Sequence, residues 1–335
     1  MRFKSLQTLK ILLFLAVPAS FYAQDLETLP KIISYTDQVQ VKVHVDSYLE
    51  NYFISGEGMD EELKLATNND LRLTGLFDYK IFSFSYSFTP GFLPGNDDND
   101  ERGDSQYQDF TVRLFPGQFV QEFKYQRLKG FYVENTDVLF PDFFDNEGYL
   151  LFPDLKRTFY GGSTSYVLNP DFSLEGLLYQ RKWQRVSAGS FVPTFNYSYA
   201  RLKNDFETYT GVENNFDFSL DVSYYYNAVI EEQFNIAPYA FGGIGTRMST
   251  YERSGEEYND KESNTYFTTE YGAGIQVGYN TSKFLMGARL NYKSLSYTNE
   301  NDTSLKDDSW YGLFFIGYRF DPPEKLRQTT ERLGL

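Results

Sequence analysis

The sequence predicts an all-β protein, a closed antiparallel transmembrane β-barrel of 12 strands, with 14 as the alternative count. Three observations lead to this prediction. Apolar and polar residues alternate with a period of two along most of the chain, which is the pattern of β-strands. Aromatic residues make up 19% of the chain although its mean hydropathy is −0.48. The N-terminus has the composition of an export signal.

The N-terminus resembles a secretory signal peptide. Basic residues precede an apolar run at 11–17, which is too short for a transmembrane helix of about 20 residues. We expect cleavage after Ala23, with Ala19 as the alternative position. The predicted segments are then a signal peptide at 1–23, an N-terminal periplasmic segment at 24–38, the β-barrel at 39–320 and a polar C-terminal tail at 321–335.

Charge and cysteine content exclude several classes of protein. The chain has 46 acidic and 31 basic residues, and its net charge of −15 disfavours nucleic acid as a partner because phosphate backbones are repelled. It has no cysteine, so neither disulfides nor thiol chemistry are available. The acidic residues concentrate in predicted loops such as 96–101, where the spacing of an EF-hand is missing.

The predicted strands are long. Val39, Val41, Val43 and Val45 alternate with polar residues, and several later runs reach ten residues or more, which is the length that crosses a membrane. Barrels of this class have an even number of strands, so we expect either that 39–53 lies outside the wall or that another strand lies in 132–157. The predicted strands are 39–53, 69–77, 80–88, 105–115, 118–131, 158–168, 172–180, 187–201, 215–226, 234–246, 264–279, 284–297 and 309–320.

The connections fall into two sizes. Short turns are expected on the periplasmic side and long polar loops outside the cell, as in bacterial outer-membrane barrels. A soluble β-sandwich would show the same alternation, but the polar positions here are often small, as at Gly272 and Gly274, which suits a confined interior. The predicted long loops are 89–104, 132–157, 202–214, 247–263 and 298–308.

If the apolar faces meet lipid, the polar faces line the lumen. Charges of both signs occur there, and two interpretations remain open: they line a water-filled pore, or they pair across a narrow interior and close it. The candidate lumen-lining residues are Asp109, Arg113, Glu122, Lys124, Asp217, Asp221, Glu270, Arg289, Lys293 and Arg319.

Arg181, Lys182 and Arg185 form a basic cluster beside Trp183. This candidate rim cluster either binds lipid phosphates at the membrane surface or forms a polar turn.

The residues for covalent catalysis are scarce. His44 is the sole histidine, and no serine motif lies near it in the sequence, so a Ser-His pair is not expected. A zinc site is disfavoured for the same lack of nitrogen and sulfur ligands. We therefore expect no enzyme activity, no cofactor and no metal.

Three stretches resemble an uncharacterised family of exported proteins that is classed as a domain of unknown function. They are 126–132 (QRLKGFY), 180–191 (QRKWQRVSAGSF) and 316–323 (IGYRFDPP), and in the second Trp183 and Val186 replace more usual polar residues. The resemblance covers most of the mature chain. It implies an outer-membrane β-barrel and assigns no catalytic residue.

The expected function is that of an outer-membrane β-barrel in a Gram-negative cell that passes or binds small polar solutes without covalent chemistry. The alternatives are a structural or surface-interaction barrel with a plugged lumen and, less favoured, a membrane-embedded hydrolase. Expected partners are membrane lipid and lipopolysaccharide, the barrel-assembly machinery during biogenesis and a small polar solute.

Overall fold

The period-two segments form antiparallel strands that close into a ring. The computed structural model describes residues 30–48, 52–54, 63–256, 259–298 and 304–334. Residues 31–335 form one unit, and the description concerns that unit. The expected signal peptide at 1–23, with both cleavage positions, lies outside the described residues.

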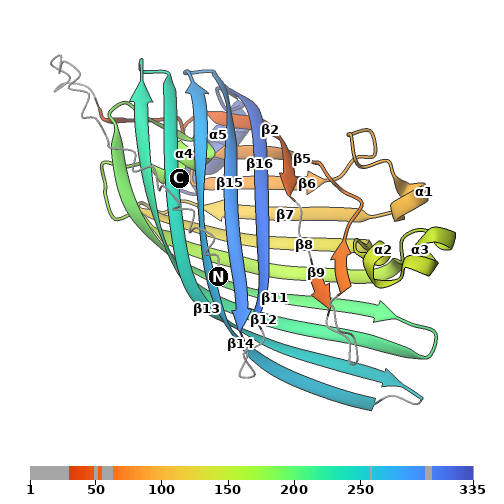
Figure 1. Cartoon of the computed structure of the whole chain (residues 1–335). Helices are drawn as coiled ribbons and strands as arrows, with labels where there is room; N and C mark the ends of the chain where they lie inside the picture. Colours follow the sequence, from red (N-terminus) through yellow and green to blue (C-terminus); the bar gives the residue numbers. More distant parts are fainter. Residues whose placement is uncertain (1–29, 49–51, 55–62, 257–258, 299–303, 335) are drawn as a thin grey trace, which may run out of the picture. The chain divides into compact units, whose positions relative to one another are not determined.

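Twelve strands of the described chain make the wall, and each pairs antiparallel with its sequence neighbours in the wall (Figure 1). The first and last strands close the ring, from Val39 opposite Phe320 to Tyr48 opposite Tyr311. The predicted all-β barrel is confirmed, with the lower strand count. The wall strands are β2 (Val39–Tyr48), β5 (Arg72–Tyr79), β6 (Phe82–Phe88), β7 (Gln106–Leu114), β8 (Phe119–Val133), β9 (Leu151–Tyr166), β11 (Ala188–Asp205), β12 (Tyr209–Ile230), β13 (Phe234–Gly255), β14 (Asn259–Asn280), β15 (Phe284–Thr298) and β16 (Ser304–Phe320).

The other elements lie between the wall strands or at the ends of the chain. Among the residues that the structure describes, strand β1 pairs only with β10, while β3 and β4 form a hairpin that continues the sheet from the end of β8. These elements are β1 (Ile32–Ser34), β3 (Tyr52–Ile54), β4 (Leu63–Ala66), β10 (Lys182–Gln184), α1 (Asn99–Arg102), α2 (Thr136–Leu139), α3 (Pro141–Glu147), α4 (Leu174–Tyr179) and α5 (Glu324–Arg332).

The odd thirteenth strand of the sequence prediction is a helix. Segment 172–180 contains α4, whereas 39–53 supplies β2 of the wall and 132–157 holds α2 and α3 before β9 begins. Both explanations offered for the odd count were therefore wrong. Ser173 caps α4 by accepting a hydrogen bond from the Gly176 amide at 2.9 Å, and apolar residues at 174, 177 and 178 have helical spacing.

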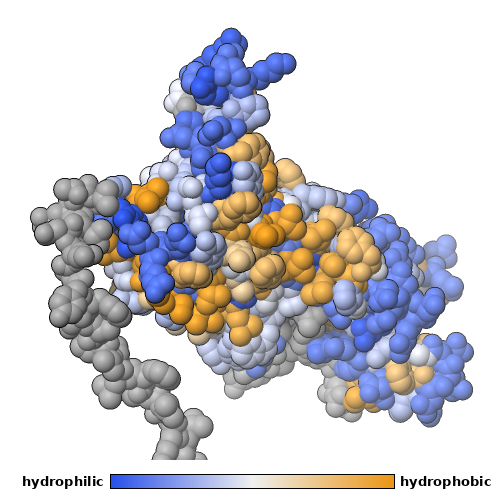
Figure 2. Space-filling view, turned by 90° about the horizontal axis from the view of Figure 1, so that it is seen from above, coloured by the Kyte–Doolittle hydropathy of each residue, from blue (hydrophilic) through white to orange (hydrophobic). Residues whose placement is uncertain are grey.

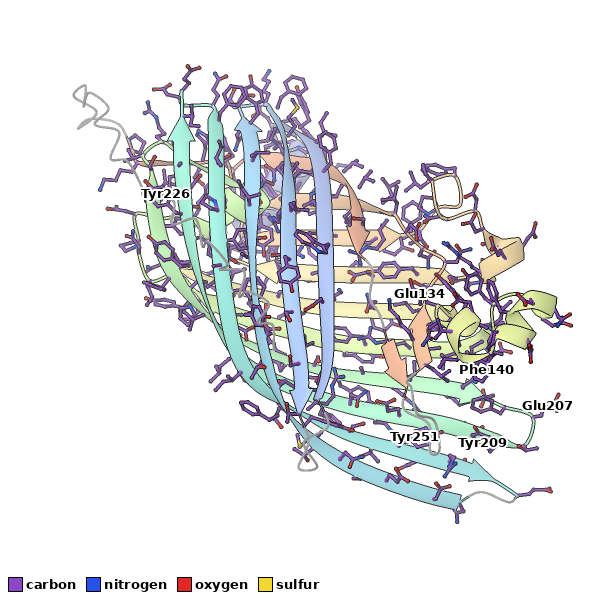
Figure 3. All side chains as sticks on the ribbon, in the orientation of Figure 1. Glu134, Phe140, Glu207, Tyr209, Tyr226 and Tyr251 are labelled. Carbon is purple, nitrogen blue, oxygen red and sulfur yellow. The ribbon has the colours of Figure 1, made fainter. Side chains whose placement is uncertain are left out.

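The two ends of the barrel differ. Turns such as 80–81 and 116–118 lie at the end where β2 starts and β16 finishes, which we call the short-turn end. At the other, long-loop end, the predicted loops 202–214 and 247–263 are mostly strand, because β11 to β14 continue there as hairpins. Tyr209 and Tyr226, near opposite ends of β12, mark this length (Figure 3).

The outward face of the wall is apolar and aromatic. Consecutive residues show the alternation, since Asp109 is 5% exposed and Phe110 is 47% exposed. In the space-filling view, apolar side chains gather in one zone with hydrophilic surface on either side (Figure 2). No helix of the described residues has both the length and the apolarity to cross a membrane.

Cross-strand aromatic pairs form two rows on this face. The two rows are eight residues apart on β11, about 26 Å along a strand and about 20 Å of height after tilt, which approaches the apolar band of membrane barrels of about 25 Å. The row near the short turns is Phe119–Tyr166, Phe191–Tyr224, Phe234–Tyr279 and Phe284–Tyr318, with ring centroids 4.7–4.9 Å apart, and the other row is Tyr125–Tyr160, Tyr199–Phe216 and Tyr292–Trp310.

The predicted polar tail contains a helix. Helix α5 follows Pro323, and the Thr330 hydroxyl lies 3.4 Å from the Tyr79 hydroxyl at the end of β5. The tail is thus folded back onto the short-turn end of the barrel.

Candidate functional site

The charged residues of the wall lie on its inward face. Arg113 stands opposite Glu122 in the ladder between β7 and β8, and Phe123, next to Glu122 on the outward face, is 47% exposed. The inward face holds every candidate from the sequence: Asp109, Arg113, Glu122, Lys124, Asp217, Asp221, Glu270, Arg289, Lys293 and Arg319.

Most of these charges pair along the wall. Each of the four ion pairs joins neighbouring strands, so the expectation of pairs across a narrow interior is wrong for these residues. Arg247 was missed because it fell at the edge of a predicted loop. The pairs are Arg113–Glu122 at 2.5 Å, Lys124–Asp109 at 3.0 Å, Arg247–Asp217 at 2.6 Å and Lys293–Glu270.

A polar hollow of about 210 Å³ lies on the inward face of β8, β9, β11 and β12. Gly161 has no side chain on this face between Lys124 and Ser198, and the Phe159 ring packs against its Cα. Eight of its eleven lining residues carry a hydroxyl, amide or charged group, although apolar atoms form the larger part of its surface. Such a mixed lining suits a small molecule with several polar groups. The lining residues are Glu122, Lys124, Phe159, Gly161, Gly162, Ser163, Asn196, Tyr197, Ser198, Asp217 and Ser219.

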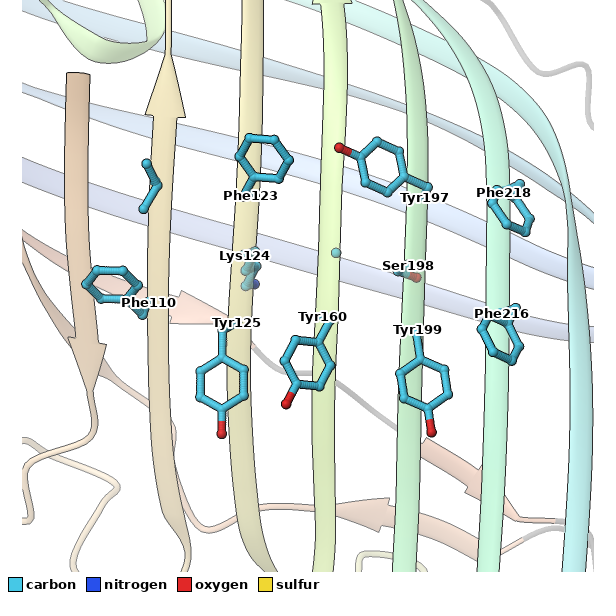
Figure 4. Close-up of a pocket in the computed structure, with 12 residues that line it drawn as sticks. Phe110, Phe123, Lys124, Tyr125, Tyr160, Tyr197, Ser198, Tyr199, Phe216 and Phe218 are labelled. Atoms are coloured by element: carbon cyan, nitrogen blue, oxygen red, sulfur yellow. The ribbon is translucent and has the colours of Figure 1, made fainter. Parts of the chain in front are cut away.

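A larger hollow of about 520 Å³ lies over β7 as well as β8, β9, β11 and β12, and most of its lining residues are aromatic. Figure 4 shows its rings, with the hydroxyls of Tyr125, Tyr160 and Tyr199 pointing the same way along three neighbouring strands. The following residue, Gly162, is on the outward face and lies beside Phe123 and Tyr197 in the ladders. The two glycines therefore leave room at this step of β9 for the Phe159 ring beside Gly161 and the Tyr197 side chain beside Gly162.

The connection between β9 and β11 fills the short-turn end of the barrel, and we call residues 168–187 the plug. Leu174 and Leu177 of α4 are buried in an apolar cluster with Phe115, Val192 and Ala237 from the surrounding strands and turns. Because α4 also touches inward side chains of β2, β14, β15 and β16, it lies within the ring of strands. This placement puts α4 inside the short-turn end of the barrel.

Polar side chains of the wall bind the last carbonyls of α4. Two of them are arginines and one is a lysine, so three of the five hydrogen bonds are charge-assisted, and the other two come from glutamine amides. We call this set the latch. Its bonds run from Gln40 Nε2 to Tyr179 O (3.0 Å), Lys42 Nζ to Tyr179 O (2.5 Å), Arg289 Nη2 to Leu178 O (3.3 Å), Gln276 Nε2 to Leu177 O and Arg319 Nη2 to Gln180 O.

Residues 180–187 of the distinctive 180–191 segment form the second half of the plug, and residues 188–191 begin β11. Strand β10 pairs with β1, so the segment preceding the barrel holds the plug in place. The Trp183 indole N–H donates to Glu232 O at 2.5 Å, in the turn between β12 and β13. The plug is therefore attached to the wall on several sides.

The predicted basic cluster belongs to the plug. Arg181 is 2% exposed, with its guanidinium 4.0 Å from the centre of the Phe115 ring. Lys182 pairs with Glu175 at 2.6 Å, and Arg185 pairs with Glu232 at 3.0 Å. The cluster is therefore divided: Arg181 is buried in the barrel, and the other two residues make ion pairs.

His44 lies on the inward face beside Phe315, with ring centroids 5.7 Å apart. Its Nε2 atom makes no hydrogen bond with any described residue. The described part of the chain contains no group of three or more His, Cys, Asp or Glu side chains placed to hold a metal ion.

The chain belongs to the family described as Domain of unknown function (DUF4421), whose model matches residues 32–320. The resemblance found in the sequence is thus confirmed. None of the curated proteins compared with the chain matches it.

Similar solved structures are outer-membrane proteins. In-vitro folded OmpT of Vibrio cholerae, in its trimer form, is 12% identical, with 84% of this chain and 97% of that chain covered and a TM-score of 0.34. The beta domain of the Bordetella autotransporter BrkA is 10% identical, with 85% and 99% covered and a TM-score of 0.38.

Proposed function

We propose that the protein binds small polar solutes in the lumen of an outer-membrane barrel, and that the plug closes the short-turn end until it moves. One observation carries this proposal: the polar hollow lies on the inward face next to a lumen end that α4 fills. Glu122 connects the two, because it lines the hollow and pairs with Arg113, whose guanidinium lies 5.2 Å from the Tyr179 ring centre. The proposed binding site and the plug are therefore adjacent.

The proposal assigns no covalent chemistry to the barrel. His44 has no hydroxyl or carboxylate partner within the described residues, which supports a role in packing against Phe315. The small volume of the hollow, about 210 Å³, suits a molecule the size of a single sugar or amino acid, below the usual range for drug-sized ligands of about 300–1,000 Å³.

We also propose that the barrel sits in the outer membrane with its short-turn end in the periplasm, surrounded by lipid and lipopolysaccharide, after insertion by the barrel-assembly machinery. The apolar outward face and its two aromatic rows support the place in the membrane, and the short turns support the orientation, because turns of outer-membrane barrels are short on the periplasmic side. A closed barrel in an outer-membrane fraction should migrate faster on a gel before boiling than after, because its backbone groups are paired in a closed ring.

Removal of the plug tests the closed lumen. Asn169 Nδ2 donates to Gly189 O at 2.8 Å, so a short Gly-Ser turn in place of residues 171–186 can connect β9 to β11. In planar bilayers we expect no steady channel from the native chain and discrete conductance from the plugless variant. The matched control replaces α3 at the long-loop end in the same way and should remain closed.

Two results would contradict the proposal. Steady conductance of the native chain would mean that the plug does not close the lumen. A folded plugless barrel without conductance, with folding checked by heat-modifiable migration, would favour the alternative of a structural barrel with a filled interior.

A further inference from the structure

Buried positive charge surrounds the plug. Five basic side chains gather there, and two of them have carboxylate partners: Lys42 lies 3.6 Å from Asp78, and Arg113 lies 2.5 Å from Glu122. The other three, Arg181, Arg289 and Arg319, make no ion pair within the described residues. Arg181 and Arg319 are fully buried, and burying an ion without an ion-pair partner costs several kcal/mol, so this arrangement requires an explanation in a chain whose net charge is −15.

Arg181 is the least satisfied of the three. It is 2% exposed, and its Nη1 and Nη2 atoms have no hydrogen-bond partner in the described part of the chain. Arg181 lies close enough to Lys42 and Asp78 to interact with both electrostatically. Its guanidinium thus belongs to the same cluster as the latch and has unused donors.

The remaining latch cations bind neutral groups. Arg289 and Arg319 donate to the carbonyls of Leu178 and Gln180, which carry only partial negative charge. A carboxylate or phosphate carries a full negative charge and can accept two parallel hydrogen bonds from one guanidinium, which a single carbonyl oxygen cannot do in the same way. An oxyanion would therefore compete with α4 for these side chains.

We propose that the solute is a small molecule carrying a carboxylate or phosphate group, and that this oxyanion releases the plug by replacing the α4 carbonyls on Lys42, Arg289 and Arg319. The proposal rests on the proposed function and names its solute class. Arg113 provides the route, because it touches α4 at Tyr179 and pairs with Glu122 on the rim of the polar hollow. Arg181, with free donors, supplies an additional site for the incoming anion.

The plug carries its own reporter. The chain has two tryptophans, Trp183 in β10 and Trp310 on the outward face of β16, which are 4% and 62% exposed. Trp310→Phe therefore leaves a single buried indole within the plug. Release of the plug should move its fluorescence emission to longer wavelength.

The experiment titrates inorganic phosphate, and separately acetate, into the full-length W310F barrel. Potassium chloride at matched ionic strength controls for screening, and glucose is the neutral comparison. We expect a saturable red shift with one or both oxyanions and none with chloride or glucose. The phosphate and acetate arms distinguish the two anion classes, and no shift with either overturns the proposal.

Arg181→Gln in the same background tests the site. Since Arg181 makes no hydrogen bond through Nη1 or Nη2 to the described residues, its loss should leave the plug seated and raise the half-saturating oxyanion concentration about tenfold, as expected for one charge-assisted bond. Arg253→Gln, at a paired arginine on β13 near the long-loop end, is the matched control and should bind as the parent does. An equal response of both variants would overturn the proposal.

Failure of this inference is distinguishable from failure of the proposed function. The plugless barrel tests closure by conductance in potassium chloride alone. If it conducts while Trp183 shows no oxyanion response, the closed lumen stands and the anion latch is wrong. If Trp183 responds and the plugless barrel does not conduct, the latch stands and the lumen does not open to solutes.

Discussion

Two segments leave the wall and pack on its inward face, the plug at the short-turn end and the β3–β4 hairpin at the long-loop end (Figure 1). The hairpin covers an apolar cluster with Leu63 and Leu65 and joins β8 through the ladder pairs Leu65–Val133 and Ala66–Tyr132. The plug has an apolar cluster too, but its α4 carbonyls are held by buried charged and amide side chains.

The difference lies in what can compete with each attachment. Exposing apolar side chains to water is unfavourable, and no solute replaces their packing. We therefore expect the hairpin to stay packed wherever the barrel is folded. Charged side chains bound to neutral carbonyls have a better partner in an anion. Both segments are therefore stably packed, while the plug alone has attachments that a solute can replace.

The largest expected effect comes from a charge in each apolar cluster. Leu177 of α4 and Leu65 of β4 are both 0% exposed. Aspartate at either position buries an unpaired carboxylate, which costs several kcal/mol and should expel the segment. Leu177→Asp should open the channel in planar bilayers, and Leu65→Asp should free the hairpin with the plug still closed. Conductance from Leu65→Asp alone would reverse the assignment of the closing element.

An intermediate effect is expected from the latch. Arg319 donates to Gln40 Oε1 at 2.9 Å and to Asn280 Oδ1 at 2.7 Å as well as to the plug. Arg319→Met should weaken plug attachment by about 2–5 kcal/mol because buried partners lose a charged donor. Lys64→Met, which removes a half-exposed pair with Glu134 beside the hairpin, should cost at most about 1 kcal/mol. Amide hydrogen exchange in residues 174–184 measures the effect on the plug, and exchange in residues 63–66 measures the effect on the hairpin. An equal loss of protection in the two segments would contradict the expected difference between them.

The smallest effect is expected at a helix cap. Ser173→Ala removes the side-chain acceptor at the start of α4 and should destabilise the plug by about 1 kcal/mol. Amides of α4 should then exchange several-fold faster while those of the β11–β12 ladder do not change. Thr329→Ala in the exposed α5 helix is the control, since its hydroxyl donates to a carbonyl of its own helix and holds no other element. Faster exchange throughout the wall would show that α4 is part of the barrel's global folding unit.

The pattern of the wall could be predicted from the sequence because a strand's faces follow directly from alternation. The ends of the long strands were misjudged. Between the long-loop end and the aromatic row nearer to it, charged residues such as Glu252 and Arg253 replace apolar ones. Their cross-strand pairs with Lys261 and Asp260 are visible only in the ladder. Such residues resemble a loop when read one at a time.

The plug was misjudged for a different reason. Phe172 and Leu174 alternate with Asp171 and Ser173, which imitates a strand over four residues. The helical signal was the serine cap together with the apolar spacing from Leu174 to Leu177, and it extends over a single short helix. A helix this short gains its stability from packing rather than from propensity.

By itself the sequence determined the barrel class, the lipid-facing side of each strand and the inward position of the ten charged candidates, since these depend on neighbours along the chain. Only the tertiary structure decided which of those charges pair and which bind the plug. That choice depends on the register between strands and on residues more than a hundred positions apart, as in the contact of Arg319 with Gln180. Local alternation carries no information about such distances.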